Sequence, residues 1–272
     1  MRTPRFTAAR LERARRQLSE RDLAVLVSLD KVRILTLRQL QRLHVPDGSP
    51  SARTRRAQLL LTRLHKHGLV VRFDRTIGGV RAGSSGYVYG LTGFGQAVID
   101  ATGPLGRRRR RTWETKPYFQ DHLLATSELY VHLVEEHSQG EADLLDFDAE
   151  PTCWRHFTGS GGELVVLKPD AYVRLGVEDY ERSSFIEVDL TTEGLPTIQR
   201  KSQRYIDYWR SGIEQQRRGV FPKVTWLVKD AHRGERITSV IRKLASDAQA
   251  LFEVGRLDRG AGLLKGGQGA AA

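Results

Sequence analysis

Three carboxylates near the ends of two apolar segments have the residue types and spacing of a divalent-metal site. Residues 164–170 read as a strand that ends in Asp170, and residues 184–190 read as a second strand that contains Glu187 and Asp189. Because successive side chains of a strand point to opposite faces, Glu187 and Asp189 are expected on one face. The two segments therefore predict carboxylates gathered on neighbouring strands.

The chain between these segments predicts how they pair. Residues 176–181 read as a hairpin loop centred near Glu178 and Asp179, and antiparallel pairing back from that centre sets Asp170 opposite Glu187. Carboxylate oxygens suit Mg²⁺ or Mn²⁺, which can polarise a phosphodiester and activate a water molecule. We expect Asp170, Glu187 and Asp189 to be metal ligands and catalytic residues of such a site.

A lysine on the following helix could supply the positive charge that the reaction needs. Ile198, Lys201, Tyr205 and Trp209 fall on one stripe of a helix predicted for residues 196–210, and a lysine on such a stripe calls for an anionic partner. We expect Lys201 to be catalytic, with Lys168 as the second candidate. The alternative is a lysine whose stem covers the core while its ammonium reaches solvent.

The elements predicted around these residues form an α/β domain with a central mixed sheet. A helix is expected over residues 119–137, strands over 144–150, 152–157 and 224–229, and a final helix over 235–252. Four side chains on the helices expected over residues 119–137 and 196–210 are candidates for supporting roles, as extra ligands, bases or phosphate contacts: His122, Glu128, Gln203 and Tyr205. A tyrosine nucleophile (Tyr130, Tyr205 or Tyr208) remains an alternative, although no paired-histidine metal motif accompanies it.

Charge divides the chain into two parts of opposite sign. Residues 1–117 contain 25 Lys and Arg against 8 Asp and Glu, which leaves 19 against 24 for the remainder of the 272 residues. A basic part suits a polyanion, most simply DNA, and an acidic part suits a divalent cation. High arginine usage from a GC-rich genome could explain the total but not the asymmetry.

The basic part predicts a winged helix-turn-helix domain. Capping boxes begin helices at Ser19 and Thr36, a third helix spans residues 52–67, and two short strands (69–75 and 86–91) enclose a Gly/Ser/Arg-rich loop. In such a domain the third helix enters the major groove and the loop contacts the backbone. The expected DNA contacts are Arg53, Arg55, Arg56, Arg63, Arg81 and the run Arg107, Arg108, Arg109, Arg110 and Arg111. The alternatives are a solvated basic face and a protein-binding module.

Composition places the protein among cytoplasmic globular proteins. The chain is 39% hydrophobic, has no run long enough to cross a membrane, and has a single cysteine, Cys153. The expected organisation is a basic arm (1–18), a winged helix domain (19–102), an Arg-rich linker (103–117), an α/β domain (118–253) and a flexible tail (254–272). Nothing in the sequence indicates the oligomeric state.

The second domain resembles the PD-(D/E)XK nuclease superfamily in its element order and in Pro169-Asp170 followed by Glu187-Val188-Asp189. The resemblance implies that Asp170 and Glu187 bind Mg²⁺. It departs from the pattern at Asp189, where the superfamily has a lysine. The resemblance also allows relocation of that lysine to the next helix, which supports Lys201.

The whole chain resembles the replication-relaxation family of actinobacterial mobile elements over about residues 20–250. The likeness rests on residues 122–130, on Lys168-Pro169-Asp170, and on Glu187 through Lys201 to Tyr205. It implies a winged helix followed by a degenerate nuclease-like domain, DNA as the partner, and contact with plasmid replication or conjugation machinery. The expected function is a metal-dependent DNA nickase or endonuclease, and the alternative is a non-catalytic DNA-binding regulator with a nuclease-like scaffold.

Overall fold

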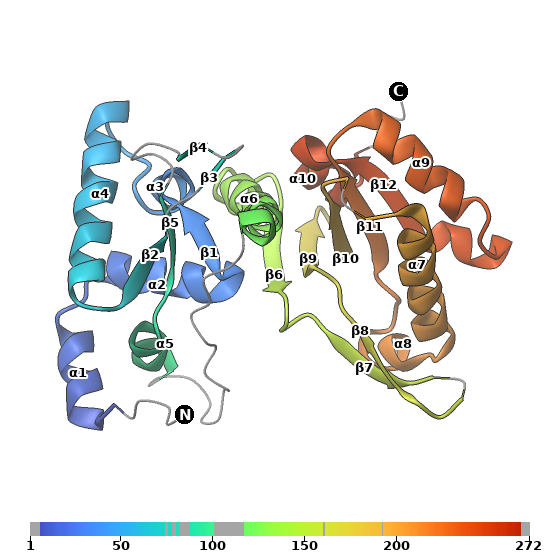
Figure 1. Cartoon of the computed structure of the whole chain (residues 1–272), viewed down its shortest axis with the longest axis horizontal. Helices are drawn as coiled ribbons and strands as arrows, with labels where there is room; N and C mark the ends of the chain where they lie inside the picture. Colours follow the sequence, from blue (N-terminus) through green and yellow to red (C-terminus); the bar gives the residue numbers. More distant parts are fainter. Residues whose placement is uncertain are drawn as a thin grey trace. The chain divides into compact units, whose positions relative to one another are not determined.

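The computed structural model describes residues 6–73, 76–77, 80–81, 87–100, 117–159, 161–191 and 193–267 (Figure 1). Contacts divide the chain into two compact units, Met1–Val131 and His132–Ala272. We call these the first and the second unit and describe each by itself.

The first unit combines short helices with a three-stranded antiparallel sheet. Its helices are α1 (Ala8–Arg16), α2 (Glu20–Val32), α3 (Leu37–His44), α4 (Pro50–Lys66) and α5 (Gly93–Asp100). The sheet has the order β1 (Ile34–Thr36), β5 (Val88–Leu91), β2 (Val70–Phe73), and a small hairpin pairs β3 (Thr76–Ile77) with β4 (Val80–Arg81).

Local sequence signals explain where these helices begin. The predicted capping boxes at Ser19 and Thr36 are both present. In each, the hydroxyl of the capping residue accepts from the backbone N–H of the third helical residue, and the side chain of that third residue accepts from the backbone N–H of the capping residue. Ser49 caps α4, and Pro50 follows at its first turn. Leu26, Leu40, Leu61 and Leu64 from α2, α3 and α4 are completely buried between the helices.

Helix α6 (Pro117–Ser138) begins in the first unit and ends in the second. Its Leu123 and Leu124 join a buried cluster with Ile34 and Val88, and the Ser127 hydroxyl donates to the Ile34 carbonyl at 2.8 Å. The early turns of α6 are therefore part of the core of the first unit.

The second unit is built on a mixed sheet, as predicted, and this sheet has five strands. The strand order is β12 (Phe252–Arg256), β11 (Lys223–Val228), β10 (Tyr180–Asp189), β9 (Ala171–Val177), β6 (Asp143–Ala149). Strands β10, β11 and β12 run parallel, whereas β9 is antiparallel to both β10 and β6. Helices α7 (Leu195–Arg210) and α9 (Ala231–Ile241) pack together, and their apolar residues share one buried cluster with those of the sheet.

Two expectations about this unit need correction. Residues 164–170 are not one strand: β8 (Leu164–Leu167) pairs with β7 (Arg155–Thr158) in a separate hairpin, and Asp170 lies between β8 and β9. Residues 254–267 are not a flexible tail, because β12 is the fifth strand of the sheet and α10 (Gly260–Leu264) buries Ala261 and Leu264. Strand β12 comes directly after a short 3-10 helix (Ser246–Leu251). The apolar residues before β12 have helix-like spacing, so the sequence predicted a helix there and not a strand.

A short helix and a buried ion pair complete the second unit. Helix α8 (Ile213–Arg218) presents Glu214, which is completely buried and lies 3.2 Å from the guanidinium of Arg155 in β7. Tyr208 donates to the same carboxylate at 2.5 Å.

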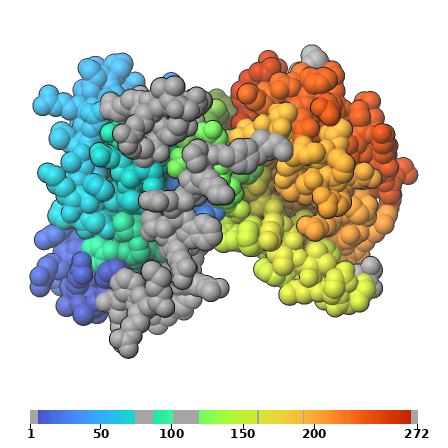
Figure 2. Space-filling view, in the orientation of Figure 1, coloured from blue at the N-terminus to red at the C-terminus, as the bar shows by residue number. Residues whose placement is uncertain are grey.

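Among the described residues, no helix is both long and apolar enough to cross a membrane. In the space-filling view of Figure 2, the side chains of α4 lie at the surface of the first unit.

Candidate functional site

Backbone pairing fixes Asp170 next to Glu187. The Asp170 N–H donates to the Ile186 carbonyl at 3.0 Å, and the Asp170 carbonyl accepts from Glu150 at 3.0 Å. Since Ala171 pairs with Ile186, the antiparallel register sets Asp170 opposite Glu187. The hairpin turn at residues 178–179 and the register that follows from it are therefore confirmed.

Two contacts hold the Asp170 carboxyl group and the segment before it. Asp170, which directly precedes the first residue of β9, accepts a hydrogen bond at Oδ2 from the backbone N–H of Val188 at 2.7 Å. The buried thiol of Cys153 donates to the Pro169 carbonyl at 3.0 Å. Burial raises the pKa of this thiol, so Cys153 remains neutral and acts as a hydrogen-bond donor. Nothing in the spacing of Cys153 in the sequence indicated this role.

Glu187 is the buried centre of the site. It is 2% exposed, and its Oε1 accepts a hydrogen bond from the Tyr205 hydroxyl at 2.7 Å. Its Oε2 lies 3.1 Å from the Nζ atom of Lys201. Both partners come from α7, four residues apart, so one face of that helix holds both carboxylate oxygens. The anionic partner expected for Lys201 is therefore Glu187, while the catalytic role of Lys201 and the supporting role of Tyr205 stay predictions.

A second carboxylate meets the same ammonium. Glu193, from the loop between β10 and α7, places Oε1 3.0 Å from Lys201 Nζ. Lys201 thus bridges Glu187 and Glu193 and is 29% exposed at its side chain. The sequence reasoning assigned no role to Glu193, and its nearness to Lys201 depends on how the loop turns.

Burial sets the protonation of this cluster. It raises the pKa of Glu187 to about 7, although the Lys201 ammonium and the Tyr205 hydrogen bond oppose the shift. Burial lowers the pKa of Lys201, but the carboxylates of Glu187, Asp170 and Glu193 outweigh it and raise that pKa above its usual range. Lys201 therefore stays charged near neutral pH, while Glu187 is poised to gain or lose a proton there.

Asp189 has a different role from the one predicted. It shares a face of β10 with Glu187, as expected, but Arg233 of α9 donates to both its oxygens, at 3.0 Å to Oδ1 and 2.6 Å to Oδ2. The same guanidinium donates to the Glu193 carbonyl at 2.6 Å. Asp189 and Arg233 are both buried. Asp189 is thus an ion-pair partner that anchors the Glu193 loop, and the prediction of a metal ligand there does not fit the geometry.

The other predicted supporting residues lie elsewhere. Glu128 is in the first unit, where it forms an ion pair with Arg42 and accepts from Gln39 at 2.8 Å. His122 is also in that unit and stacks on Phe119, with 6.5 Å between ring centroids. Gln203 donates to Asp207 at 2.9 Å on the exposed side of α7. Within the second unit, Gln203 therefore does not contact Asp170 or Glu187, and these contacts of Glu128 and His122 lie within the first unit.

Lys168, the second candidate for the catalytic cation, lies over an aromatic ring. Its Nζ atom lies 4.7 Å from the ring centroid of Trp154. Lys201 is therefore the lysine that this structure brings to the carboxylates.

The donor set fits a site with two carboxylates rather than three. Among the residues that the structure describes, no group of three or more His, Cys, Asp or Glu side chains is placed to hold a metal ion. Asp170, which directly precedes β9, nevertheless lies opposite Glu187 of the adjoining strand β10. Mg²⁺ is commonly held by one or two carboxylates with water and substrate phosphate as the other ligands. These two residues could hold such an ion.

The predicted DNA contacts on α4 differ in their surroundings. Arg53 donates to the Pro46 carbonyl at 3.3 Å, and Arg56 donates to the Asp47 carbonyl. Arg63 lies 2.5 Å from the buried carboxylate of Asp22. Arg55 is exposed on the outer side of the helix. The side chain of Arg81 and residues 107–111 lie outside the described part of the chain.

Comparison with known proteins identifies one family. A family model described as Replication-relaxation matches residues 26–224, which include both units' central elements. The sequence matches none of the curated proteins with which it was compared. Among solved structures, that of the restriction endonuclease FokI is similar with 11% identity and a TM-score of 0.25, over 99% of this chain and 74% of that chain. This TM-score is too low to indicate a shared fold.

Proposed function

Because the chain belongs to the replication-relaxation family, we propose that it acts on the DNA of a plasmid or other mobile element during replication, relaxation or conjugative transfer. In this proposal the first unit binds the DNA and the second unit nicks it with a divalent metal ion, Mg²⁺ or Mn²⁺. The protein would work in the cytoplasm, together with replication or conjugation machinery.

The first unit supports DNA binding by its element order and its charge. Three helices (α2, α3 and α4) followed by an antiparallel sheet is the order of a winged helix domain, in which α4 would enter the major groove. Residues 1–117 carry the excess of positive charge. Arg55 on the outer side of α4 is well placed to meet DNA, since its side chain is exposed.

The observation that carries the catalytic proposal is the meeting of Asp170, Glu187 and Lys201. Asp170 directly precedes β9, Glu187 lies on the adjoining strand β10, and the Lys201 ammonium is 3.1 Å from Glu187. This is the residue set of a PD-(D/E)XK nuclease whose lysine has moved to α7. The central mixed sheet and flanking helices are consistent with that fold.

Each residue has a chemical task in this proposal. Asp170 and Glu187 would hold a hard cation, which supplies a polarised phosphate and a water of lowered pKa. Lys201 would stabilise the negative charge that develops on the phosphate oxygens when water adds and the P–O bond breaks. Tyr205 would orient Glu187 through its hydrogen bond to Oε1. Glu193 would hold Lys201 before DNA arrives.

Supercoiled plasmid provides the test. Purified protein with Mg²⁺ should convert supercoiled plasmid to the nicked form, and Asp170→Ala and Glu187→Ala should each lose that activity while binding duplex DNA as tightly as the unmodified protein. Glu235→Ala on the exposed side of α9 is the matched control and should nick normally. Nicking that survives both site substitutions would contradict the assignment of the site.

A second candidate function is a non-catalytic DNA-binding factor. It is favoured by the observation that Lys201 already neutralises Glu187 and that Asp189 is fully engaged by Arg233, which leaves a self-sufficient ion-pair network. In that case the protein would bind duplex DNA with no Mg²⁺-dependent nicking, and Asp170→Ala would change neither. The same plasmid assay therefore separates the two functions.

A further inference from the structure

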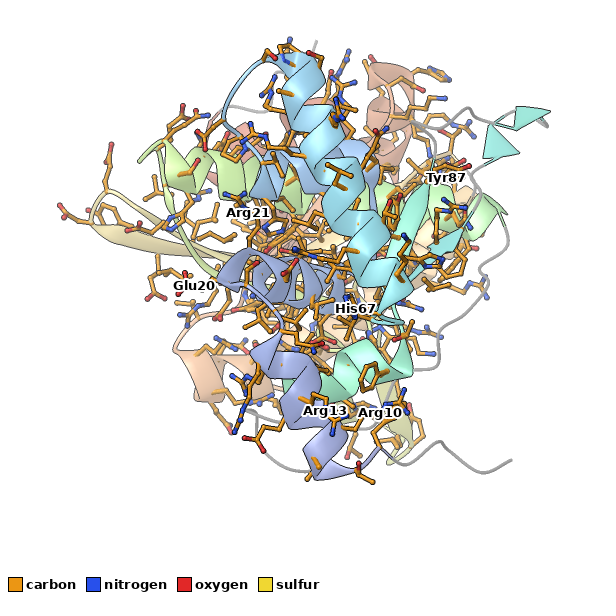
Figure 3. All side chains as sticks on the ribbon, turned by 90° about the vertical axis from the view of Figure 1, so that its left-hand side faces the viewer. Arg10, Arg13, Glu20, Arg21, His67 and Tyr87 are labelled. Atoms are coloured by element: carbon orange, nitrogen blue, oxygen red, sulfur yellow. The ribbon has the colours of Figure 1, made fainter. Side chains whose placement is uncertain are left out.

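A hollow on the first unit lies between the beginning of α2 and one side of α4. Its volume is about 780 Å³. Polar and apolar side chains from the two helices line it: Ser19, Glu20, Arg21, Arg56, Leu59, Leu60 and Arg63. Figure 3 looks onto this side of the first unit, with Glu20 and Arg21 labelled at the beginning of α2.

The arginines from α4 reach the hollow from the same side of that helix. Arg56 and Arg63 are seven residues apart, which is close to two helical turns or about 10 Å along the axis. Leu60 lies between them and also lines the hollow. Arg21, from the first turn of α2, supplies the third guanidinium from a different helix.

Contacts within the protein orient two of the three guanidinium groups. Arg63 is fixed by the buried Asp22 at 2.5 Å, and Arg56 is fixed by the Asp47 carbonyl. Each of these contacts uses one nitrogen of a group with five N–H donors. The remaining donors can bind a planar or tetrahedral anion without a large loss of side-chain entropy, because the side chains are already ordered.

The charge of the lining favours an anion. Three arginines face it, against the exposed Glu20 and the Asp22 carboxylate buried behind Arg63. The Ser19 hydroxyl is engaged with Asp22 in the capping box of α2. The apolar side chains of Leu59 and Leu60 add a surface that can pack against a sugar.

We propose that this hollow is a phosphate-binding site in which Arg21, Arg56 and Arg63 contact a phosphate group. The proposal rests on DNA binding by the first unit and deepens it, because it places a backbone phosphate on the flank of α4 rather than on its outer side. A DNA backbone and a free phosphate anion offer the same chemistry, and the experiment separates them.

The test uses the full-length protein with two probes, a fluorescent duplex and inorganic phosphate. Arg21→Gln and Arg56→Gln each remove one lining charge and leave the buried Asp22 with its partner Arg63. Each should weaken duplex binding about three- to tenfold at about 100 mM salt, for every duplex sequence alike, and should lower the slope of log K against log salt by about 1. Lys31→Gln is the control, because Lys31 is exposed in the last turn of the same helix α2.

The inorganic phosphate arm identifies the source of the phosphate. If phosphate displaces the duplex more strongly than chloride at equal ionic strength, and this excess disappears in Arg21→Gln and Arg56→Gln, the hollow binds free phosphate as well. If only the duplex slope changes, the site is specific for the DNA backbone. Duplex affinity and salt slope that match those of Lys31→Gln in both variants would overturn the proposal and would favour another occupant such as an acidic protein segment.

The two proposals fail separately. If Arg21→Gln and Arg56→Gln do not alter duplex binding, the prediction of Mg²⁺-dependent nicking by Asp170 and Glu187 still stands. If the protein does not nick DNA, the lower salt slopes predicted for the two arginine variants still stand.

Discussion

Glu187 is the residue at which stability and chemistry compete. Its carboxyl group is buried, and hydrogen bonds from Lys201 and Tyr205 occupy both oxygens. Taking a carboxylate out of water costs free energy that one ion pair offsets only in part. The same burial that strains the fold would strengthen the interaction of this carboxylate with a cation.

We predict that Glu187→Gln removes a pH-dependent part of the stability. The pKa of Glu187 is about 7 in the folded protein against 4.5 for an ordinary glutamate, so its contribution to stability is complete below about pH 4.5 and is lost as the pH rises through 7. Between pH 5 and pH 8 the unmodified protein should therefore lose on the order of 2–3 kcal/mol relative to Glu187→Gln. Urea unfolding at the two pH values measures the difference.

Glu235→Gln, at an exposed position, is the control for this comparison and should follow the unmodified protein at both pH values. A stability difference between Glu187→Gln and the unmodified protein that stays constant, or grows in the opposite direction, would show that Glu187 is charged throughout the range.

Asp189 should behave as a structural residue. Asp189→Asn leaves the buried guanidinium of Arg233 without its charged partner, which should lower the free energy of unfolding by about 3–5 kcal/mol whether or not Mg²⁺ is present. Asp207→Asn, an exposed substitution on α7, should change it by less than about 0.5 kcal/mol. A loss seen only with Mg²⁺ would mean that Asp189 is a metal ligand after all.

At the scale of elements, local sequence patterns predicted that Asp170 lies opposite Glu187, but they did not predict which distant side chains contact the site. The turn at Glu178 and Asp179 fixes the register of β9 and β10, so the neighbourhood of Asp170 and Glu187 follows from short-range spacing. The spacing of Lys201 and Tyr205 likewise predicted that both lie on one stripe of a helix. These are contacts that helical or strand periodicity determines.

Contacts between distant segments could not be predicted in this way. Arg233 meets Asp189 across 44 residues, and only the packing of α9 against the sheet brings them together. Glu128 and His122 lie on the helix that was expected to serve the site, but the early turns of that helix pack in the first unit. These contacts depend on where a helix packs in the folded protein, and the local pattern of that helix alone does not predict its packing position.

The fifth strand, β12, should contribute to the stability of the second unit. Phe252 is 8% exposed and belongs to the main buried cluster, so Phe252→Ala should lower the free energy of unfolding by about 3–5 kcal/mol. Val220→Ala, at a residue that is 61% exposed, is the control and should be nearly neutral. Urea unfolding provides both values, and a loss below about 1 kcal/mol for Phe252→Ala would contradict the role of β12.

At the scale of the whole molecule, the proposed function assigns DNA binding to the basic first unit and cleavage to the second unit. The basic unit offers guanidinium groups along α4 and around the hollow, and the acidic unit offers carboxylates around a single lysine. This division predicts that binding and cleavage can be changed independently, because no residue assigned to one activity is assigned to the other. The family match, which spans residues 26–224, includes both sets of residues.

The role of Lys201 tests the central claim most directly, and the measurement is the rate of Mg²⁺-dependent nicking of supercoiled plasmid by Lys201→Met beside Lys168→Met. The two substitutions remove the same charge, but Lys201 contacts Glu187, whereas Lys168 contacts Trp154. We expect Lys201→Met to lose about a hundredfold or more in rate with unchanged duplex affinity, and Lys168→Met to nick normally. Equal rates for the two variants would contradict the claim that this cluster is a nuclease site.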